Sequence, residues 1–309
     1  MTVHVVKPGF FTTVQDGGRF GYAHLGISPA GAADALALRI ANLLVGNEEY
    51  APGLEMTLLG ATFAFDVPAV VALSGASCEC KLGSETVSAN EAVAIAAGSV
   101  LQCGSTTNGA RCYLAVQGGF AVSVVMGSAS TDIRGGFGGV EGRRLQKGDV
   151  LRIGSRRNAQ VRRLDAGVAE SLKRKGPIRV TRGAQCGWFS TESFAKFLSS
   201  PCGVSEQWDR AGLRLQGEPV SSREKTQLLT DGIPLGAIQV PRDGQPIILF
   251  VDQQTTGGYP KIANVISADM HRIGQLRPRD QVRFAEVSIT EAIEALRAQE
   301  RWLKEIFVT

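Results

Sequence analysis

The chain has 309 residues, of which 44% are hydrophobic and 20% charged, and its formal net charge at pH 7 is +4. This composition is typical of a globular protein with apolar material for one large or two medium cores. The scattered basic residues argue against a nucleic-acid-binding protein, and no window holds the ~20 apolar residues that a membrane helix needs. The N-terminus lacks the basic and apolar regions of a signal peptide. We therefore expect a cytoplasmic protein with no nucleic-acid and no membrane partner.

The cysteines and histidines give little sign of a disulfide framework or a metal site. There are six cysteines and three histidines, and without a secretory signal disulfides are not expected. The close pair Cys78 and Cys80 lacks the C-x-x-C spacing of zinc ligands, and no histidine is near it in sequence. We predict that the cysteines are small buried residues in a reducing compartment and that the chain holds no metal.

The first predicted helix lies in "GAADALALRIANLLVG", residues 31–46, where apolar residues recur at helical spacing. Asp34 precedes it at a position where a carboxylate can cap the helix, and Asn47 suits a left-handed turn after it. In the glycine-rich stretch before the helix, Asp16 and Arg19 can pair locally.

Short β-branched runs separated by turn residues dominate the rest of the chain. This pattern predicts a mainly β fold of sandwich or barrel type with few helices. The runs are "TFAF", "AVVALSG", "YLAVQGG", "DVLRIG", "IRVTRG", "GAIQVP", "PIILFV" and "QVRFAEVS". Further helices are predicted in "STESFAKFLSS" and after residue 288, where Ser288 and Glu291 have the spacing of a capping box.

The two halves of the chain carry the same succession of segments. Each has an apolar strand, a Gly-Gly turn, a valine-rich segment and then an L-x-x-x-D-x-[LV]-R hairpin. The pattern predicts two similar β-domains that arose by internal duplication. Because residues 154–176 are charged and lack strand signatures, we place the domains at residues 1–165 and 176–309.

The second copy expands its turn into "VDQQTTGGYP", residues 251–260, with polar side chains that the fold does not need. Amides and hydroxyls suit a small, polar, neutral-to-anionic substrate, and the two glycines let it approach the backbone. In "WDRAGLRLQG", an arginine fork can bind a carboxylate or phosphate, although a salt bridge to Asp209 is an equally simple explanation. The predicted catalytic residues are Asp34, Asp252 and Tyr259, and the predicted substrate-binding residues are Arg210, Arg214, Gln239, Gln253, Thr255, Thr256, Gly257 and Gly258.

A second glycine-rich stretch, "GSASTDIRGGFGGVEGRRL", contains Arg134, Arg143 and Arg144. Backbone N–H groups of such a loop can hold an anion. It lacks the Walker pattern of a phosphate-binding loop, and an array of β-turns explains the glycines as well.

Three blocks together, "TVQDGGRFGYAHLGISPAGAADALALRIANLLVGN", "GAIQVPRDGQPIIL" and "DQQTTGGYPKIANVISADM", resemble the biotin-dependent carboxyltransferase family, and the resemblance runs along nearly the whole chain. The family includes the C subunit of bacterial 5-oxoprolinase. The resemblance implies two cyclophilin-like β-barrel domains. It also implies ATP-dependent opening of 5-oxo-L-proline to L-glutamate, by lactam phosphorylation and hydrolysis with ATP and Mg²⁺ acting at the level of the complex. The implied partners are a KipI-like subunit, with the active site between the two chains, and a LamB/YcsF-like subunit.

The resemblance leaves two other functions open. One is a carboxyltransferase subunit that moves carboxyl from carboxybiotin to urea or a related amide; the biotin would sit on another protein, since this chain has no Met-Lys-Met attachment site. The other is a KipA-like regulatory partner of a KipI-type kinase inhibitor. The substrate also stays open, because the chain departs from the family's usual residues at Ala30, Ala33, Ala211, Arg242 and Arg279.

Overall fold

The computed structural model describes residues 1–155, 162–164, 176–224 and 228–306. The chain divides into two compact units. The first comprises Met1–Arg19, Ala30–Lys173 and Glu305–Thr309, and the second comprises Phe20–Pro29 and Arg174–Lys304. The boundary that the sequence predicts, between residues 165 and 176, lies outside the described residues. No helix among the described residues combines the length and apolarity of a membrane span.

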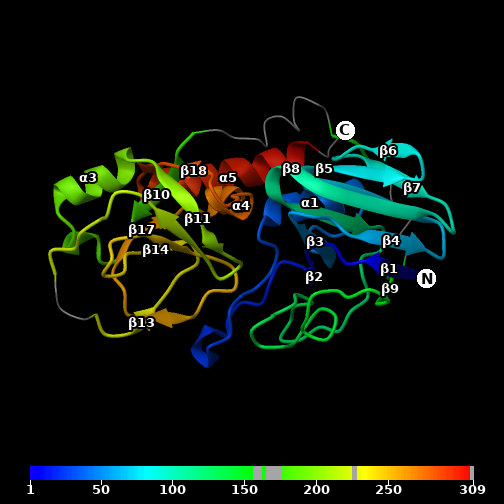
Figure 1. The fold of residues 1–309 in the computed structure, drawn as a ribbon, viewed down its shortest axis with the longest axis horizontal. Helices are drawn as coiled ribbons and strands as arrows, with labels where there is room; N and C mark the ends of the chain where they lie inside the picture. Colours follow the sequence, from blue (N-terminus) through cyan, green and yellow to red (C-terminus); the bar gives the residue numbers. More distant parts are fainter. Residues whose placement is uncertain (156–161, 165–175, 225–227, 307–309) are drawn as a thin grey trace. The chain divides into compact units, whose positions relative to one another are not determined.

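The first unit is built on a nine-stranded sheet (Figure 1). Its strands follow the order β2-β3-β8-β4-β1-β9, and β5 pairs with β6, β7 and β8. The strands are β1 (Thr2–Lys7), β2 (Phe11–Gln15), β3 (Gly53–Thr57), β4 (Thr62–Phe65), β5 (Ala69–Leu82), β6 (Glu85–Val87), β7 (Ala92–Ile95), β8 (Val100–Val116) and β9 (Val150–Arg152). The two longest, β5 and β8, run antiparallel along most of their length.

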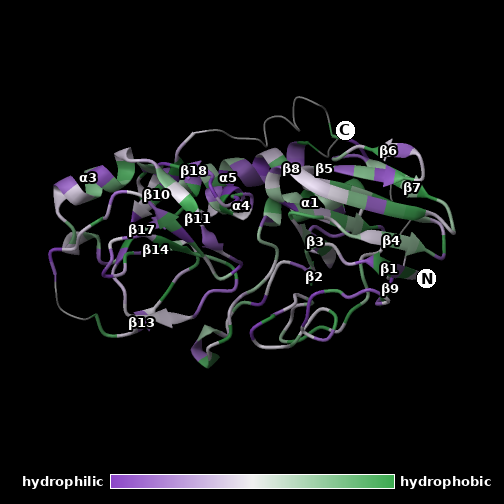
Figure 2. Ribbon diagram, viewed as in Figure 1, coloured by the Kyte–Doolittle hydropathy of each residue, from purple (hydrophilic) through white to green (hydrophobic). Residues whose placement is uncertain are grey.

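Along these strands, hydrophobic residues mostly occupy buried positions and hydrophilic residues mostly occupy exposed ones. Figure 2 shows both hydrophobic and hydrophilic residues along β8, whose first part alternates buried and exposed positions and whose last part is wholly buried. The buried side chains form one apolar cluster, which includes Val14, Leu54, Met56, Phe63, Phe65, Val71, Leu73, Leu101 and Leu114. Burial of each such side chain contributes about 1.5–3 kcal/mol.

The predicted first helix is α1 (Ala35–Leu44), and its start is as predicted. Asp34 is the N-cap, and its Oδ1 accepts a hydrogen bond from the Ala37 N–H at 2.8 Å. The prediction for its end is wrong, because Gly46 and not Asn47 takes the left-handed conformation, with φ +75°. Asn47 instead donates to the Val116 carbonyl and accepts from the Gly118 N–H, both at 2.8 Å. The asparagine therefore ties the helix end to the end of β8.

The second unit is built on an eight-stranded sheet in the order β18-β11-β12-β15-β14-β17-β10-β19. These strands are β10 (Ile178–Arg182), β11 (Cys202–Trp208), β12 (Gly212–Gln216), β14 (Ala237–Gln239), β15 (Ile247–Leu249), β17 (Lys261–Val265), β18 (Gln281–Val282) and β19 (Phe284–Glu286). A separate two-stranded sheet pairs β13 (Asp231–Gly232) with β16 (Thr256–Gly257). The helical elements are η1 (Ala23–Leu25), η2 (Cys186–Trp188), α3 (Thr191–Ser199), η3 (Ser267–Asp269), α4 (Met270–Gly274) and α5 (Ile289–Glu305).

The two large sheets share a four-strand order. In the first unit it is β2-β3-β8-β5 and in the second β11-β12-β15-β14, with every neighbouring pair antiparallel. Numbered along the chain, both orders read first, second, fourth, third. The first strand of each unit, β1 or β10, also pairs with its last, β9 or β19. The sheets form a half-barrel and a nearly closed barrel, which confirms the predicted mainly β fold with two related barrel-type domains.

The other two predicted helices are present. Ser190 caps α3 by accepting from the Ser193 N–H. The capping box of α5 is formed as predicted, since the Ser288 N–H donates to Glu291 and the Glu291 N–H donates back to Ser288. Along α5, Leu303 is buried whereas Ile289 and Ile293 are exposed, so the apolar residues of the helix are buried only in part.

The buried carboxylate of Asp269, at the start of α4, binds Arg179 on β10. This bond leads to a prediction about stability in acid. Asp269 is fully buried and accepts from the Arg179 backbone N–H at 2.8 Å and the Arg179 guanidinium at 2.6 Å. Burial by itself raises the pKa of Asp269, but the bonds from Arg179 outweigh it, so the folded pKa lies below the ordinary value of about 3.9. The carboxylate therefore stabilises the fold above the unfolded pKa, and this stability is lost as pH falls through the folded pKa.

We expect denaturant unfolding of the protein, measured from pH 6 to pH 2, to show a decline in stability that Asp269→Asn flattens. Glu294→Gln, at an exposed carboxylate of α5, serves as the control and leaves the slope unchanged. An unaltered slope in Asp269→Asn would contradict the argument.

Candidate functional site

The polar turn 251–260 links β15 to β17 in the second unit. Its middle forms strand β16, where Gly257 pairs with Asp231 and Thr256 with Gly232. The Ile233 N–H also donates to the Thr255 carbonyl at 3.0 Å. The turn is thus an ordered part of a small sheet, with defined positions for its side chains.

Arg210 and Asp252 are two predicted site residues that the structure brings into direct contact. The Arg210 guanidinium donates through Nε and Nη2 to the two oxygens of Asp252, at 2.8 and 3.0 Å. Both side chains are 6% exposed, and the Asp252 N–H donates to the Arg210 carbonyl. The bidentate pair anchors the start of the polar turn to the residues before β12, a role that the sequence did not indicate. Arg214 lies apart from this pair and binds the more exposed Asp243 at 2.9 Å.

Two buried amides support the turn from within the second unit. Gln253 is 4% exposed and donates to the Ile233 carbonyl at 3.0 Å, while its own Oε1 is buried without a donor among the described residues. Gln239, 1% exposed, donates to the Tyr259 carbonyl at 3.5 Å. An unsatisfied buried amide oxygen costs about 1–3 kcal/mol, so the free Oε1 of Gln253 is a natural acceptor for a ligand N–H.

Gly257 is needed because two side chains crowd it. A Cβ placed there would lie 2.6 Å from Ile233 Cδ1 and 2.9 Å from Gln239 Nε2. Gly258 is less crowded, with the Leu228 carbonyl 3.2 Å from a Cβ at that position. Because Gly257 has no side chain, the backbone of the turn can pack closely against Gln239.

Tyr259 lies at the surface of the turn and borders a cavity. It is 47% exposed, and together with Gly258 it lines a hollow of about 1010 Å³. Arg242 lies in the same wall and adds a cation to it. Thr255 is half-buried and Thr256 exposed. The hollow is therefore bordered by one predicted catalytic residue and by a cationic side chain.

Lys261 is a residue that the sequence analysis missed. It directly follows the polar turn, lies opposite Gln239 in the pairing of β17 with β14, and is 3% exposed. Its Nζ is 3.5 Å from a carboxylate oxygen of Asp231, whose side chain is 61% exposed. A buried ammonium needs close partners. Among the described residues the Lys261 ammonium has this one distant contact, which leaves donors for an anionic or carbonyl oxygen. The sequence feature that could have identified Lys261 as a site residue is its place between a polar turn and an apolar strand.

Asp34, the third predicted catalytic residue, belongs to the first unit. Its backbone N–H donates to the Tyr113 hydroxyl at 2.7 Å, and that hydroxyl donates to Glu55 at 2.6 Å. Burial, reinforced by the nearby Glu55 and Asp34 charges, raises the pKa of Tyr113 well above its ordinary value, so it stays a donor. Glu55 also accepts from the Ala33 N–H and lies 3.5 Å from Arg111. This buried network holds the loop that starts α1, and Asp34 serves there as a helix cap.

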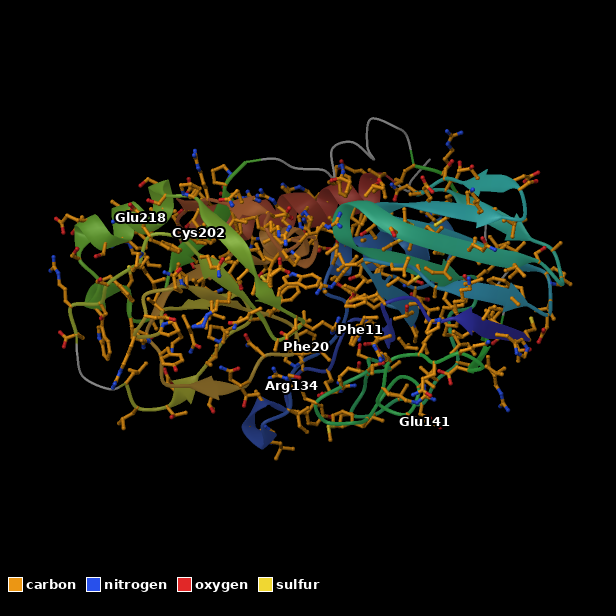
Figure 3. All side chains as sticks on the ribbon, in the orientation of Figure 1. Phe11, Phe20, Arg134, Glu141, Cys202 and Glu218 are labelled. Carbon is orange, nitrogen blue, oxygen red and sulfur yellow. The ribbon has the colours of Figure 1, made fainter. Side chains whose placement is uncertain are left out.

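The second glycine-rich stretch forms an array of turns, the simpler of the two explanations. Its N–H groups bond within the stretch and its neighbours: Gly136 to the Asp132 carbonyl, and Gly142 to the Gly138 carbonyl. Arg143 pairs with Asp149 at 2.8 and 3.0 Å. Arg134 and Glu141, labelled in Figure 3, are exposed.

The same region shows where another local prediction is wrong. Asp16 does not pair with Arg19; its carboxylate accepts from the hydroxyls of Ser128 and Ser130 and from the Gly18 N–H. Arg19 donates to the Ser130 carbonyl and lies over the Phe137 ring. Both residues therefore fasten the glycine-rich stretch to the N-terminal strands of the first unit.

Comparisons with known proteins assign the chain to a family. A family model described as carboxyltransferase domain, subdomain A and B, matches residues 25–286. The chain is 42% identical to the 5-oxoprolinase C subunit of Escherichia coli, over 98% of this chain and 96% of that protein. It is 32% identical to urea amidolyase of Saccharomyces cerevisiae, over 98% of this chain but 18% of that protein. The structure of K. lactis urea amidolyase matches 99% of this chain and 20% of that one, with a TM-score of 0.92 and 30% identity. The chain therefore belongs to the family of carboxyltransferase domains that contain subdomains A and B.

Proposed function

We propose that the chain is the C subunit of a 5-oxoprolinase, which opens 5-oxo-L-proline to L-glutamate with hydrolysis of ATP. The observation that carries the proposal is the 42% identity to a protein of that name, because it extends over 98% of this chain and 96% of the relative. A second relative of the same name is 38% identical over 95% of this chain. The similarity thus extends over nearly all of the first relative.

The polar turn of the second unit offers groups that suit 5-oxoproline. The substrate has a lactam N–H, a lactam carbonyl and a carboxylate. The free Oε1 of Gln253 can accept the lactam N–H, and the buried ammonium of Lys261 can hold an anionic oxygen. Tyr259 borders the cavity, where its hydroxyl can donate to a substrate oxygen. These groups orient the ring, while the pair of Arg210 and Asp252 holds the turn in place.

A lactam resists attack by water, and ATP bound in the complex supplies the activation by phosphorylating the lactam oxygen. The described residues of the glycine-rich stretch do not fit a triphosphate. A Cβ at Gly138 or Gly139 would lie 2.1 or 2.0 Å from neighbouring residues of the chain, so these glycines serve its own packing. We therefore assign ATP and Mg²⁺ to the complex and derive no phosphoryl step on this chain. The proposed partners are a KipI-like subunit and a LamB/YcsF-like subunit.

Carboxyl transfer to urea or a related amide is the second candidate. It is favoured by the similarity to urea amidolyase, at 32% identity over 98% of this chain. Urea offers the same N–H and carbonyl groups as a lactam but no carboxylate, so Lys261 would have no anionic partner in that substrate. A biotinylated carrier protein would have to supply the carboxyl group.

The deciding experiment measures glutamate release from 5-oxoproline and ATP, first with this chain alone and then with both proposed partners. We expect activity only in the full mixture. Tyr259→Phe and Gln253→Ala should each lower that activity about fivefold or more, since each removes a substrate hydrogen bond that is worth about 1 kcal/mol or more. Tyr50→Phe is a matched control, because Tyr50 is also 47% exposed and lies in the first unit. Full activity in both site variants would refute the site, and no glutamate from a verified stable complex would refute the function.

A further inference from the structure

Four of the six cysteines gather in one cluster in the first unit, which the sequence did not indicate. Cys78 and Cys80 lie on β5, and Cys103 and Cys112 lie on β8. The Cys78 Sγ is 3.0 Å from the Cys80 Sγ and 3.5 Å from the Cys112 Sγ. Cys80 also contacts Cys103, its direct partner across the two strands. We call these four residues the thiol cluster.

The backbone of β5 is irregular at this point. Its register against β8 shifts between Ser77 and Cys78 and again between Cys78 and Cys80. Such bulges bend a strand and redirect its side chains. Cys78 and Cys80 are two positions apart in this irregular stretch, and their sulfurs are in contact.

Solvent reaches the thiol cluster chiefly through one member. Cys78 is half-buried, whereas Cys80, Cys103 and Cys112 are 1%, 5% and 1% exposed. A dissolved reagent therefore reaches Cys78 first. The neighbouring buried thiols can then react with the oxidised Cys78 sulfur.

The hydrogen bonds within the cluster favour ionisation of that same thiol. The hydrogen bond with Cys112, and then the one with Cys80, lower the pKa of Cys78 to about 4. Contacts with Cys103 and Cys78 raise the pKa of Cys80, and the contact with Cys78 raises that of Cys112. The contacts with Cys112 and Cys80 therefore favour the thiolate form of Cys78. A thiolate is the nucleophilic form of cysteine, and partly exposed thiolates are the ones that peroxides oxidise.

We propose that Cys78 and Cys80 form a peroxide-sensitive dithiol, with Cys78 as the attacked thiol and Cys80 as the resolving thiol. In the first step the Cys78 sulfur attacks hydrogen peroxide. An S–O bond forms, the O–O bond breaks, and the released hydroxide takes up the proton that Cys78 lost on ionisation. In the second step the Cys80 sulfur attacks the sulfenic sulfur, the S–S bond forms, and hydroxide leaves with the Cys80 proton as water. Two thiols and one peroxide give one disulfide and two waters.

The test uses the purified full chain, treated with hydrogen peroxide, alkylated and digested with trypsin. Cleavage after Lys81 leaves Cys78 and Cys80 in one peptide, residues 40–81, and places Cys103 and Cys112 in two others. We expect peptide 40–81 to lose both alkyl groups and to become two hydrogens lighter than its reduced form. The other four cysteines should stay alkylated. Oxidation should be at least about tenfold faster than at a buried thiol, because an ordinary thiol is only a few per cent thiolate at pH 7.

Matched variants separate the dithiol from general oxidation. In Cys78→Ser, Cys80 should stay alkylated after peroxide treatment. In Cys103→Ser, Cys78 and Cys80 should still lose their alkyl groups. Cys202, labelled in Figure 3, is buried at the start of β11, where burial raises its pKa; Cys202→Ser should change nothing. Equal alkylation of all six cysteines after peroxide would overturn the proposal. So would oxidation of Cys202 at the rate of Cys78, or a cross-link from peptide 40–81 to another peptide in place of the internal bond.

Discussion

Arg210→Met is expected to lower the free energy of unfolding of the second unit by about 3–5 kcal/mol, since it leaves Asp252 buried without its cationic partner. The two side chains are each 6% exposed and joined by two hydrogen bonds. The loss should appear in denaturant unfolding followed by tryptophan fluorescence, because Trp188 and Trp208 both lie in the second unit.

Two control variants show whether the burial of the ion pair causes the loss of stability in Arg210→Met. Arg214→Met breaks a more exposed pair with Asp243 and should cost about 0–1 kcal/mol. The double variant Arg210→Met with Asp252→Leu removes both charges and should recover much of the loss. If Arg210→Met costs no more than Arg214→Met, the pair does not anchor the turn.

Gly257→Ala should lower the proposed glutamate-releasing activity at least tenfold while the chain stays folded. The added methyl would lie 2.6 Å from Ile233 Cδ1 and 2.9 Å from Gln239 Nε2, so the Gln239 amide or the turn must shift. Overpacking of this kind costs about 1–3 kcal/mol, and a displacement of about 1 Å at a substrate-orienting group can cost a hundredfold in rate. Activity of the reconstituted complex and the unfolding midpoint of the chain give the two readouts.

Gly232→Ala is the matched control, because Gly232 lies on the facing strand β13 and has no atom within 4 Å of a Cβ. This variant should keep both activity and stability. If both substitutions lower activity and stability equally, the small sheet tolerates no added side chain at either position. That result would contradict a specific role for Gly257.

Local features were the ones that the sequence could predict. The cap at Asp34 and the capping box of Ser288 and Glu291 depend on residues three positions apart, so the chain itself brings the groups together. The β-branched runs and the repeated order of segments similarly predicted two related β units, because strand alternation and turn residues act over short distances.

Partners far apart in the chain could not be predicted in the same way. Arg210 seemed able to pair with Asp209, its neighbour, but its actual partner is Asp252, 42 positions away. Lys261 reads as a surface residue at the start of a strand, and only the pairing of β14 with β17 buries it beside Gln239. The thiol cluster could not be predicted for the same reason, because the strand register determines which cysteines come into contact.

The shared four-strand order of the two sheets has a consequence for how this chain could have changed over time. Once a gene holds two copies of one fold, each copy can accept substitutions that would be costly in a single-copy ancestor. In the first unit the turn after β8 stayed short, and its Gly118 and Gly119 keep positive φ angles and pack against the chain. In the second unit the corresponding turn is longer and carries one buried amide, Gln253, and the buried carboxylate of Asp252, which pairs with Arg210. The first unit thus shows this part of the fold with a short turn, and a comparison of the two turns identifies the polar residues that the shared strand order does not require.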